Sequence, residues 1–542
     1  MAVGSAKPSP ISTPSQTTSR AEKTEARESY LVGALILLGI VSLIRILLIR
    51  NLPLTGDEAY YWQWSKHLAL GYHDHPPLVG WLIRAGSLFG QGAFWVRFPS
   101  LVLAFLGSLF FFLFVREITQ SGKSAFQALS LLIAIPIFSV CALAIFPDAP
   151  LVFSWSFFLW ASWKWLSDEK YWPWMGAALG LAALSKLMGL FLFPSLLMFL
   201  VSSNRERMLL RRASLWKSLG LGLLLASPFL YWNAQHHFET FTYQAHQRLT
   251  HSISPAPFFF FNYVSLQFAS LSPIVFVLFL GTLYMLIQKS LKGDIRSRFL
   301  LWMALPIHLS FLLISFLTRV GLHWALPGYL SILAASPLWI ETLNEKRKSL
   351  GTTFFYAALS SSLVLTLFFL SLLAWPQKLV PWIASLGLHH QGVNQGKTID
   401  SQTITEILGY QELGDRVDKE LSGLTDSTKK QTFVFSDSYS LSSIMSFYAH
   451  HDAKTLLFTS TGGEYDRWNH FEDYQGNDAL YVDTQPIGSR PDINQILHQA
   501  FLKVVPLEPL RVDRGRLETR TFYFAHCVTL VNPRALRPNW PW

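Results

Sequence analysis

Two carboxylates stand side by side at Asp57 and Glu58, soon after the first long apolar segment of the chain ends. A carboxylate held at a membrane surface can remove a proton from a reacting hydroxyl or bind a cation. His73, Asp74 and His75 then offer three metal-ligand side chains in consecutive positions. The same acidic and histidine residues could instead serve structure alone, as the cap of a helix that lies in the membrane interface and as the polar loop after it. Neither segment therefore decides the function alone.

A third carboxylate and further cations occur in later short polar segments. Asp148 stands at the tip of a proline-flanked turn, where it could also bond only its own backbone. Lys186 interrupts a long apolar stretch and can bind a phosphate as a point charge or reach toward lipid headgroups. Arg319 is a second candidate for a phosphate by its charge and position. Histidines, His236 among them, gather in the same segments, which favours a metal or phosphate site.

The composition shows which elements must position these groups. Of the 542 residues, 51% are hydrophobic and only 14% are charged, where a soluble domain carries about 25% charged residues. Residues 1–375 hold 28 basic and 15 acidic residues, and residues 376–542 hold 16 and 19. This division excludes a single soluble globule, a disordered chain and an ordinary nucleic-acid binder. It predicts a membrane domain at 30–375, after a disordered cytoplasmic lead at 1–29, and an aqueous domain at 376–542.

Apolar runs of the length that crosses a bilayer, about 20 residues, predict eleven transmembrane helices. They lie at 31–50, 94–115, 125–146, 149–166, 171–185, 187–202, 214–231, 261–287, 299–317, 320–340 and 352–375. The first run is too long and too late for a cleaved signal peptide, so it is expected to remain as an anchor. Reading 171–202 as one helix would give ten spans and reverse the side of every later loop.

The positive-inside rule favours eleven spans, because these place 20 of the 28 basic residues on the cytoplasmic side. The topology therefore accounts for the net positive charge of the chain, and this charge does not indicate a polyanionic partner. The same topology places five carboxylates on the outer side, which are Asp57, Glu58, Asp74, Asp148 and Glu239. Ionisable groups near a membrane are costly and often functional. The carboxyl-terminal domain is expected outside the membrane as well.

The carboxyl-terminal domain combines short strand-like runs with amphipathic helical patterns. Strands are predicted at 432–436, 479–482 and 522–525, and helices at 404–421 and 440–449. We expect a small α/β domain without a catalytic constellation of its own. Cys141 lies in an apolar run and Cys527 in this domain, so no disulfide is expected.

Four motifs in order resemble a known superfamily. They are Asp-Glu-Ala-Tyr-Tyr at 57–61, Tyr-His-Asp-His-Pro-Pro at 72–77, Phe-Pro-Asp-Ala-Pro-Leu at 146–151, and Ser-Lys at 185–186. The chain resembles the GT-C superfamily of integral-membrane glycosyltransferases, in its protein-mannosyltransferase-like branch. That branch includes the lipid A aminoarabinose transferase and the rhizobial lipopolysaccharide galacturonosyltransferases. The resemblance covers 31–375 and is most specific in the first 190 residues, with a further match at 462–468.

This resemblance implies an inverting transfer of a sugar from a polyprenyl-phosphate carrier to an acceptor outside the membrane. The acceptor would be lipid A, lipopolysaccharide or another envelope glycan. The protein would be a multi-pass component of the bacterial inner membrane with a periplasmic carboxyl-terminal domain.

The resemblance also suggests roles for the outer residues. Asp57 matches the catalytic base or acceptor-orienting carboxylate, and Glu58 and Asp148 match two further acids of the catalytic region. Asp74 falls where the aminoarabinose transferase uses a glutamate to help hold a divalent metal. The full set of expected site residues is Asp57, Glu58 and Asp148 for catalysis, Lys186, Arg319 and His75 for the donor phosphate, and Asp74, His73 and His236 for a divalent metal.

Position 75 departs from the aminoarabinose transferase, which has a lysine near the carrier phosphate there, so the resemblance does not imply direct phosphate contact by His75. Two other functions remain open. A protein O-mannosyltransferase would share the fold and differ mainly in its acceptor. A flippase or transporter of lipid-linked sugar should show broken helices and polar groups at the bilayer midplane, often in paired halves. The acids of this chain gather on one face, which favours chemistry at the surface.

Overall fold

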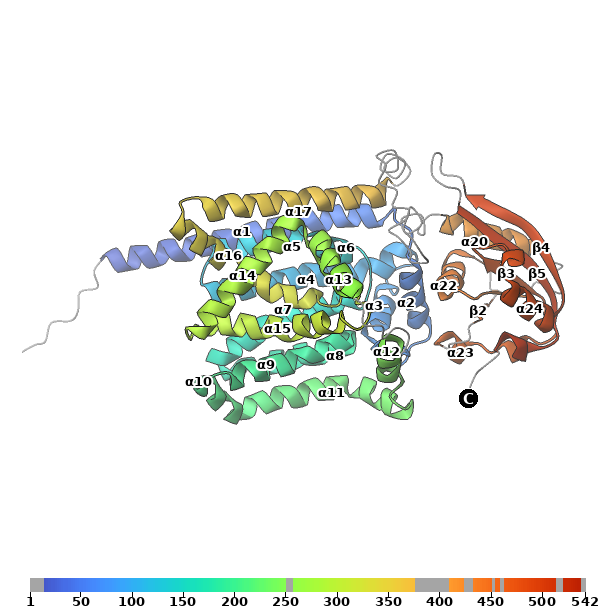
Figure 1. Ribbon diagram of the computed structural model, residues 1–542, viewed down its shortest axis with the longest axis horizontal. Coiled ribbons are helices and arrows are strands. Elements are labelled where there is room, and N and C mark those ends of the chain that lie inside the picture. The colour runs from blue at the N-terminus through green and yellow to red at the C-terminus, as the bar shows by residue number, and fades with distance from the viewer. Residues whose placement is uncertain are drawn as a thin grey trace, which may run out of the picture.

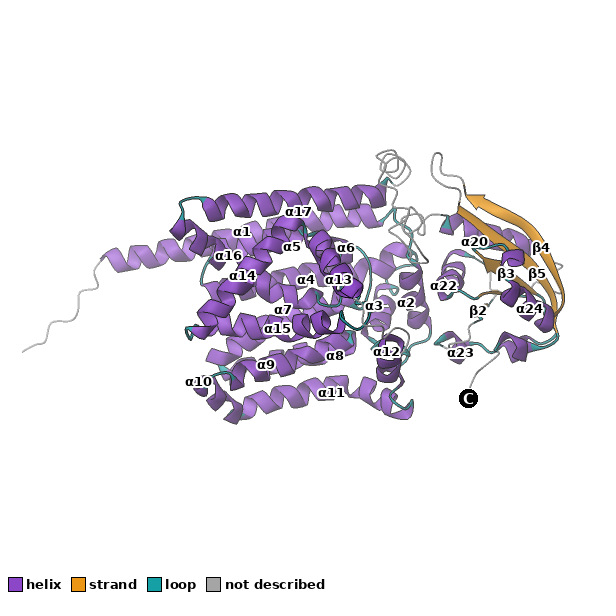
Figure 2. Ribbon diagram, in the orientation of Figure 1, coloured by secondary structure: helices purple, strands orange, loops and turns teal. Residues whose placement is uncertain are grey.

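The structure is a computed structural model that describes residues 14–249, 257–375, 409–423, 432–450, 454–458, 463–512 and 520–537. It consists of a helical bundle and a carboxyl-terminal domain built around a sheet, as Figure 2 shows by secondary structure. The carboxyl-terminal domain lies at one end of the bundle, and the start of helix α1 projects from the opposite end (Figure 1). We call the end of the bundle at which the carboxyl-terminal domain lies the domain end. Helix α17 of the bundle ends at Ala374, and the described part of the carboxyl-terminal domain begins at residue 409.

The long helices of the bundle lie roughly side by side along its length (Figure 1). Their bounds are α1 Pro14–Ile49, α4 Ala93–Thr119, α5 Gly122–Ala134, α7 Asp148–Ser167, α8 Trp172–Ser185, α9 Leu192–Val201, α11 Ala213–Gln235, α14 Pro273–Leu291, α15 Ile295–Ile314, α16 Leu326–Lys346 and α17 Leu350–Ala374. Large side chains such as Trp155, Phe199 and Phe299 are fully buried between them. The chain is therefore an integral membrane protein whose helices pack around an apolar core.

Length and composition identify six of the described helices as able to cross a membrane, or seven if the bent pair at 187–201 and 204–211 counts as one span. The number of eleven spans stays a prediction. The break at Lys186 is confirmed, because α8 ends at Ser185 and α9 begins at Leu192 after a short 3-10 turn. The ten-span reading of 171–202 as one straight helix is therefore wrong in its local geometry.

Two expectations for the helices are wrong. The run 261–287 is not one helix, because Ser272 adopts a φ of 76° and Pro273 starts a new helix after α13, Pro257–Leu271. The lead at 1–29 is not disordered throughout, because α1 already begins at Pro14. Its second half is rich in Ala, Glu, Lys and Arg, which are good helix formers.

Short helices cover the domain end of the bundle: α2 Gly56–Lys66, α3 Leu78–Gly86 and α12 Glu239–Leu249. Helix α2 begins at a capping box, in which the Thr55 side chain accepts from the Glu58 backbone N–H while Glu58 accepts from the Thr55 backbone N–H. This reciprocal cap fixes the start of the helix and holds the adjacent Asp57 in its first turn. A helix is therefore present in the predicted first outer loop, but its cap is Thr55 and not an acidic residue.

The carboxyl-terminal domain is an α/β domain, as predicted. Its five strands are β1 Phe433–Ser436, β2 Thr455–Leu457, β3 Ala479–Asp483, β4 Phe501–Val512 and β5 Arg520–Leu530, in the order β2-β1-β3-β5-β4. Strand β1 pairs in parallel with β2 and β3, and β5 pairs antiparallel with β3 and β4. Its helices are α20 Tyr410–Ser422, α22 Tyr439–Tyr448, α23 Tyr465–Trp468 and α24 Pro491–Ala500. Cys141 and Cys527 are both free, as expected.

Helix α22 packs directly on α2, so the carboxyl-terminal domain is docked against the first outer segment of the bundle. The Leu54 backbone N–H donates to the Tyr448 hydroxyl at 2.8 Å. A Cβ at Gly56 would lie 1.6 Å from the Ser440 Oγ and 2.6 Å from the Ser440 Cβ. Glycine at this position therefore permits the two helices to touch.

We expect the Gly56→Ala substitution to separate α22 from α2, because the clash includes the Ser440 Cβ and cannot be relieved by rotating the hydroxyl alone. Hydrogen–deuterium exchange should rise in both helices, and transfer activity should fall with it. Gly220→Ala is the matched control, since a Cβ there meets nothing within 4 Å. Unchanged exchange in the Gly56 variant would contradict the close docking.

Candidate active site

The Glu58 carboxylate forms a buried ion pair with Arg97 of α4. Arg97 Nε donates to Glu58 Oε1 at 2.7 Å, and its second terminal nitrogen donates to Oε2 at 2.6 Å. Both side chains are almost fully buried, with Glu58 0% exposed. Burial alone would raise the pKa of Glu58, but the Arg97 charge and the N–H groups of Thr55 and Ile145 lower it overall.

This pair corrects the catalytic role predicted for Glu58. Both of its oxygens already accept several hydrogen bonds, and the side chain has no contact with solvent. It therefore cannot reach a substrate. Arg97 also donates to the carbonyls of Leu52 and Pro53, so the pair ties the end of the first segment to α2 and α4. Glu58 acts as a positioning residue.

Asp57, its neighbour in sequence, is placed very differently. Its side chain is exposed to solvent, and the Tyr439 hydroxyl of α22 donates to Asp57 Oδ1 at 2.7 Å. The surrounding protein partly desolvates the carboxylate, which raises the pKa of Asp57, while the Tyr439 hydrogen bond lowers it and the Glu58 charge raises it. An accessible carboxylate with a raised pKa, fixed by one hydrogen bond, has the properties of a general base.

Asp148 and Lys186, predicted for separate roles, form one buried ion pair. Lys186 Nζ donates to the two Asp148 oxygens at 3.0 and 2.8 Å, and both side chains are nearly inaccessible. His323 Nε2 lies 3.8 Å from Asp148 Oδ2. An ammonium has three N–H donors, so one donor remains for another anion. Arg319 lies exposed on the same loop as His323.

The segment of His73 and Asp74 is held by residues from two distant regions. His73 Nδ1 lies 2.6 Å from Glu239 Oε1 of α12, and the His73 backbone N–H donates to Glu464 Oε1 at 2.5 Å. Arg467 of α23 bonds both carboxylates. Glu239 is therefore not a merely solvated loop acid, because it links the bundle to the carboxyl-terminal domain.

Asp74 itself retains an unpaired oxygen, since its Oδ1 is buried without a hydrogen-bond partner. The predicted metal ligand His236 is engaged elsewhere, with Nδ1 2.7 Å from the Trp232 carbonyl and its ring stacked on Trp232. Across the described ranges, no group of three or more His, Cys, Asp or Glu side chains could hold a metal ion. The structure therefore does not assemble His73, Asp74 and His236 as one metal site, and a metal stays a prediction.

The chain is similar to known sugar transferases in sequence and in fold. Residues 74–232 match the sequence profile of the family described as dolichyl-phosphate-mannose-protein mannosyltransferase. The chain is 27% identical over 334 residues to the lipid A galacturonosyltransferase RgtD of Rhizobium johnstonii, covering 59% of this chain and 68% of that protein. The structure of ArnT from Cupriavidus metallidurans bound to undecaprenyl phosphate matches with a TM-score of 0.57 at 16% identity, covering 91% of this chain and 98% of ArnT.

This chain is a membrane glycosyltransferase with the GT-C fold. The apo form of the same ArnT agrees, with a TM-score of 0.56 over the same shares of both chains. The archaeal oligosaccharyltransferase AglB of Archaeoglobus fulgidus matches with a TM-score of 0.50 at 13% identity, covering 84% of this chain and 69% of AglB. The resemblance that the four motifs indicate is thus confirmed.

The carboxyl-terminal domain contributes three residues to this glycosyltransferase site that the sequence does not predict. Tyr439, Glu464 and Arg467 come from the carboxyl-terminal domain, and Tyr439 lies 382 residues from Asp57 along the chain. The family-like stretch at 462–468 was a signal that this region matters, but it gave no contact. Tyr439 had no signal, because an isolated tyrosine in a helix is an ordinary core residue.

We expect the Tyr439→Phe substitution to reduce kcat of the transferase severalfold. We also expect it to move the acidic limb of the kcat–pH profile to higher pH. The lost hydrogen bond stabilises the charged form of Asp57, so without it the pKa of Asp57 rises and the base is protonated over a wider range. A kcat–pH profile of both proteins tests this. If kcat of the variant were lower by the same factor at every pH, Tyr439 would act only in packing.

Burial raises the pKa of Asp74 to about 7, with the Glu464 and Asp57 charges adding to this and His73 opposing it. The folded transferase therefore holds this proton at pH values where the unfolded chain has lost it, so stability falls as pH rises from about 4 to about 7. We expect Asp74→Asn to flatten this decline, giving the variant a gain in melting temperature that grows between pH 5 and pH 7. Melting curves that stay parallel across this range would contradict the burial of Asp74.

Proposed function

We propose that this glycosyltransferase moves a sugar from a polyprenyl-phosphate carrier to an acceptor hydroxyl of lipid A or another envelope glycan, with inversion at the anomeric carbon. The observation that carries the proposal is the exposed Asp57 carboxylate, held by Tyr439 beside the buried Glu58–Arg97 pair. The similarity to RgtD, a lipid A galacturonosyltransferase, supports the acceptor class. The fold shared with an ArnT structure that holds undecaprenyl phosphate supports the donor class.

Asp57 would act as the general base. It accepts the proton of the acceptor hydroxyl while the hydroxyl oxygen attacks the anomeric carbon from the face opposite the phosphate. The bond between that carbon and the phosphate oxygen breaks, and its electron pair leaves with the carrier phosphate. General-base assistance of this kind is worth roughly 10²–10⁴-fold in rate. If the acceptor oxygen belongs to a phosphate, no proton needs to be removed and Asp57 would orient the acceptor.

The leaving phosphate requires positive charge nearby. Lys186 would supply its remaining N–H donor beside Asp148, and the exposed Arg319 and the half-buried His75 are the other candidates for the phosphate. Asp148 would then hold Lys186 in place as a positioning residue, instead of touching the substrate. An ammonium fixed at this position would stabilise the developing negative charge of the phosphate electrostatically.

The reaction would take place on the periplasmic side of the bacterial inner membrane. The predicted distribution of basic residues supports this, since their clusters fall in loops on the side opposite the acids. A divalent cation remains part of the proposal only through Asp74, whose unpaired Oδ1 is a suitable ligand. Elemental analysis of purified wild type and Asp74→Asn tests it, since a bound metal would be lost from the variant.

Transfer to a protein is the second candidate function, because the family profile over 74–232 is that of protein mannosyltransferases. One experiment separates the two acceptors. Mass spectrometry compares envelope lipids and glycoproteins from cells that contain wild type, Asp57→Asn or no protein. A sugar-sized mass absent from the lipids of both defective strains supports the lipid acceptor. Its loss from glycoproteins supports the protein acceptor. A loss in the null strain alone would overturn the role of Asp57 and favour transport.

A further inference from the structure

Arg45 is a buried arginine in the membrane part of α1 for which the described residues provide no ion-pair or hydrogen-bond partner. Only 7% of it is exposed. It lies four residues before the end of α1 at Ile49, which is about 6 Å along the helix axis at about 1.5 Å per residue. An unpaired charge in an apolar interior is costly, so ionisable residues in membrane helices usually have a partner and a function.

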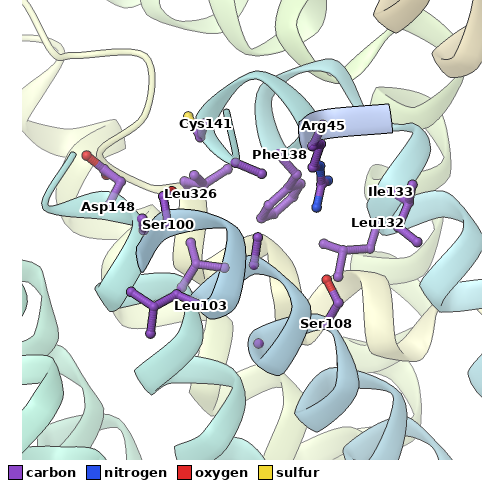
Figure 3. A pocket seen from close by; sticks show the side chains of 15 residues that line it. Arg45, Ser100, Leu103, Ser108, Leu132, Ile133, Phe138, Cys141, Asp148 and Leu326 are labelled. Carbon is purple, nitrogen blue, oxygen red and sulfur yellow. The ribbon is translucent and has the colours of Figure 1, made fainter. Parts of the chain in front are cut away.

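The Arg45 guanidinium points into a hollow of about 50 Å³ between α1, α4, α5, α7, α16 and the short helix α6, Pro136–Cys141 (Figure 3). Its walls are mainly apolar and include Leu103, Leu132, Ile133, Phe138, Val152 and Leu326. The Ser108 hydroxyl faces the same space on the side of Arg45 (Figure 3). The hollow thus combines a cation and a hydroxyl donor with a hydrocarbon-like wall.

Asp148 is the one carboxylate among the described residues of this lining, and it is not the partner of Arg45. Figure 3 places the two side chains at opposite sides of the hollow, and Asp148 is already neutralised by Lys186. Bidentate recognition by a guanidinium suits a phosphate or carboxylate. Arg45 lies about one turn inside the end of its apolar helix, and a long cationic side chain at such a position can reach the phosphate of a membrane lipid.

We propose that this hollow, which we call the Arg45 site, binds the phosphate of a membrane lipid, with Arg45 and Ser108 contacting the phosphate and the first carbons of the lipid chain lying against the apolar wall. The inference goes beyond the transfer reaction, because it concerns a second anion site on the side of the hollow away from the Asp148–Lys186 pair. The lipid is either a polyprenyl phosphate or an anionic phospholipid, which share this chemistry.

Binding to purified, delipidated full-length protein tests the Arg45 site. The probes are undecaprenyl phosphate, phosphatidylglycerol, undecaprenol and inorganic phosphate, measured by native mass spectrometry and by the shift in melting temperature. The variants are Arg45→Met, Arg45→Lys and, as matched control, Arg50→Met, which changes an exposed arginine at the same end of α1.

We expect Arg45→Met to bind at least one of the two phosphate-bearing lipids at least tenfold more weakly than wild type, with undecaprenol binding unchanged. Arg50→Met should stay within threefold of wild type. Arg45→Lys should bind these lipids more tightly than Arg45→Met, because it keeps the charge, but more weakly than wild type, because lysine cannot form the bidentate contact. Which of the two lipids shows the loss identifies the source of the phosphate. Without lipid, Arg45→Met should melt no lower than wild type, because it removes an unpaired buried charge.

Equal affinity of wild type and Arg45→Met for both lipids would overturn the inference, and a full response to inorganic phosphate alone would overturn its lipid part. Sugar transfer is measured on the same preparations. A wild type that transfers sugar but shows no dependence of lipid binding on Arg45 refutes the Arg45 site alone. Binding that depends on Arg45 in a protein without transfer refutes the proposed function alone.

Discussion

Asp57→Asn should lower kcat by about 10²–10⁴-fold, the contribution expected of a general base, while the protein still inserts and folds. Asparagine keeps the shape of the side chain and an oxygen that accepts the Tyr439 hydrogen bond, so the docking of α22 on α2 should persist. It cannot accept the proton of the acceptor hydroxyl. Transfer from a polyprenyl-phosphate sugar to lipid A by purified protein in lipid nanodiscs measures the effect.

The control for this substitution is Asp168→Asn. The Asp168 side chain is also accessible to solvent, with 43% of it exposed, but it pairs with Lys170 in the loop that follows α7, away from the domain end of the bundle. Its loss should leave kcat unchanged. Full activity of Asp57→Asn on a hydroxyl acceptor would refute the assignment of Asp57 as the general base. Reduced substrate affinity with unchanged kcat would instead assign Asp57 to acceptor orientation.

The sequence predicts much of this arrangement because several signals are local. The acids and the cations of the outer loops stand next to apolar runs, so their membrane end can be inferred from length and charge. The break at Lys186 is visible because a charged residue interrupts an apolar stretch, and the structure confirms it. The sequence predicts β1 and β3 closely, because both are short, continuous apolar runs, and it predicts the middle of β5. It does not predict β2 or β4.

What the sequence could not supply is pairing between distant residues. Asp57 and Glu58 look equivalent in sequence, but the helical turn points one toward solvent and the other toward α4, where Arg97 lies 39 residues further along the chain. Arg97 itself stands in an apolar run and gave no catalytic signal. Lys186 and Asp148 likewise carry no local pattern that would show that their two loops meet.

The second large effect is expected on stability, from the Glu58–Arg97 pair. Arg97→Met leaves a fully buried carboxylate without its cation, and removing one partner of a buried pair costs about 3–5 kcal/mol. The carbonyls of Leu52 and Pro53 lose their donor as well. The free energy of unfolding, measured by SDS titration in mixed micelles, should fall by this amount. Arg84→Met, at an exposed position of α3, should change it by no more than about 0.5 kcal/mol.

A double-mutant cycle separates the ion pair from packing. Glu58→Gln combined with Arg97→Met removes both charges, so it should cost less than the sum of the two single substitutions. The pH dependence gives an independent check. Because its folded environment lowers the pKa of Glu58, the pair stabilises the protein above the ordinary pKa of a glutamate, and this stabilisation is lost as pH falls through the folded value. Wild type should therefore lose more stability on acidification than the double variant. Additive single effects would show that Arg97 acts through its backbone contacts, and the anchoring of Asp57 would then rest on the Thr55 cap alone.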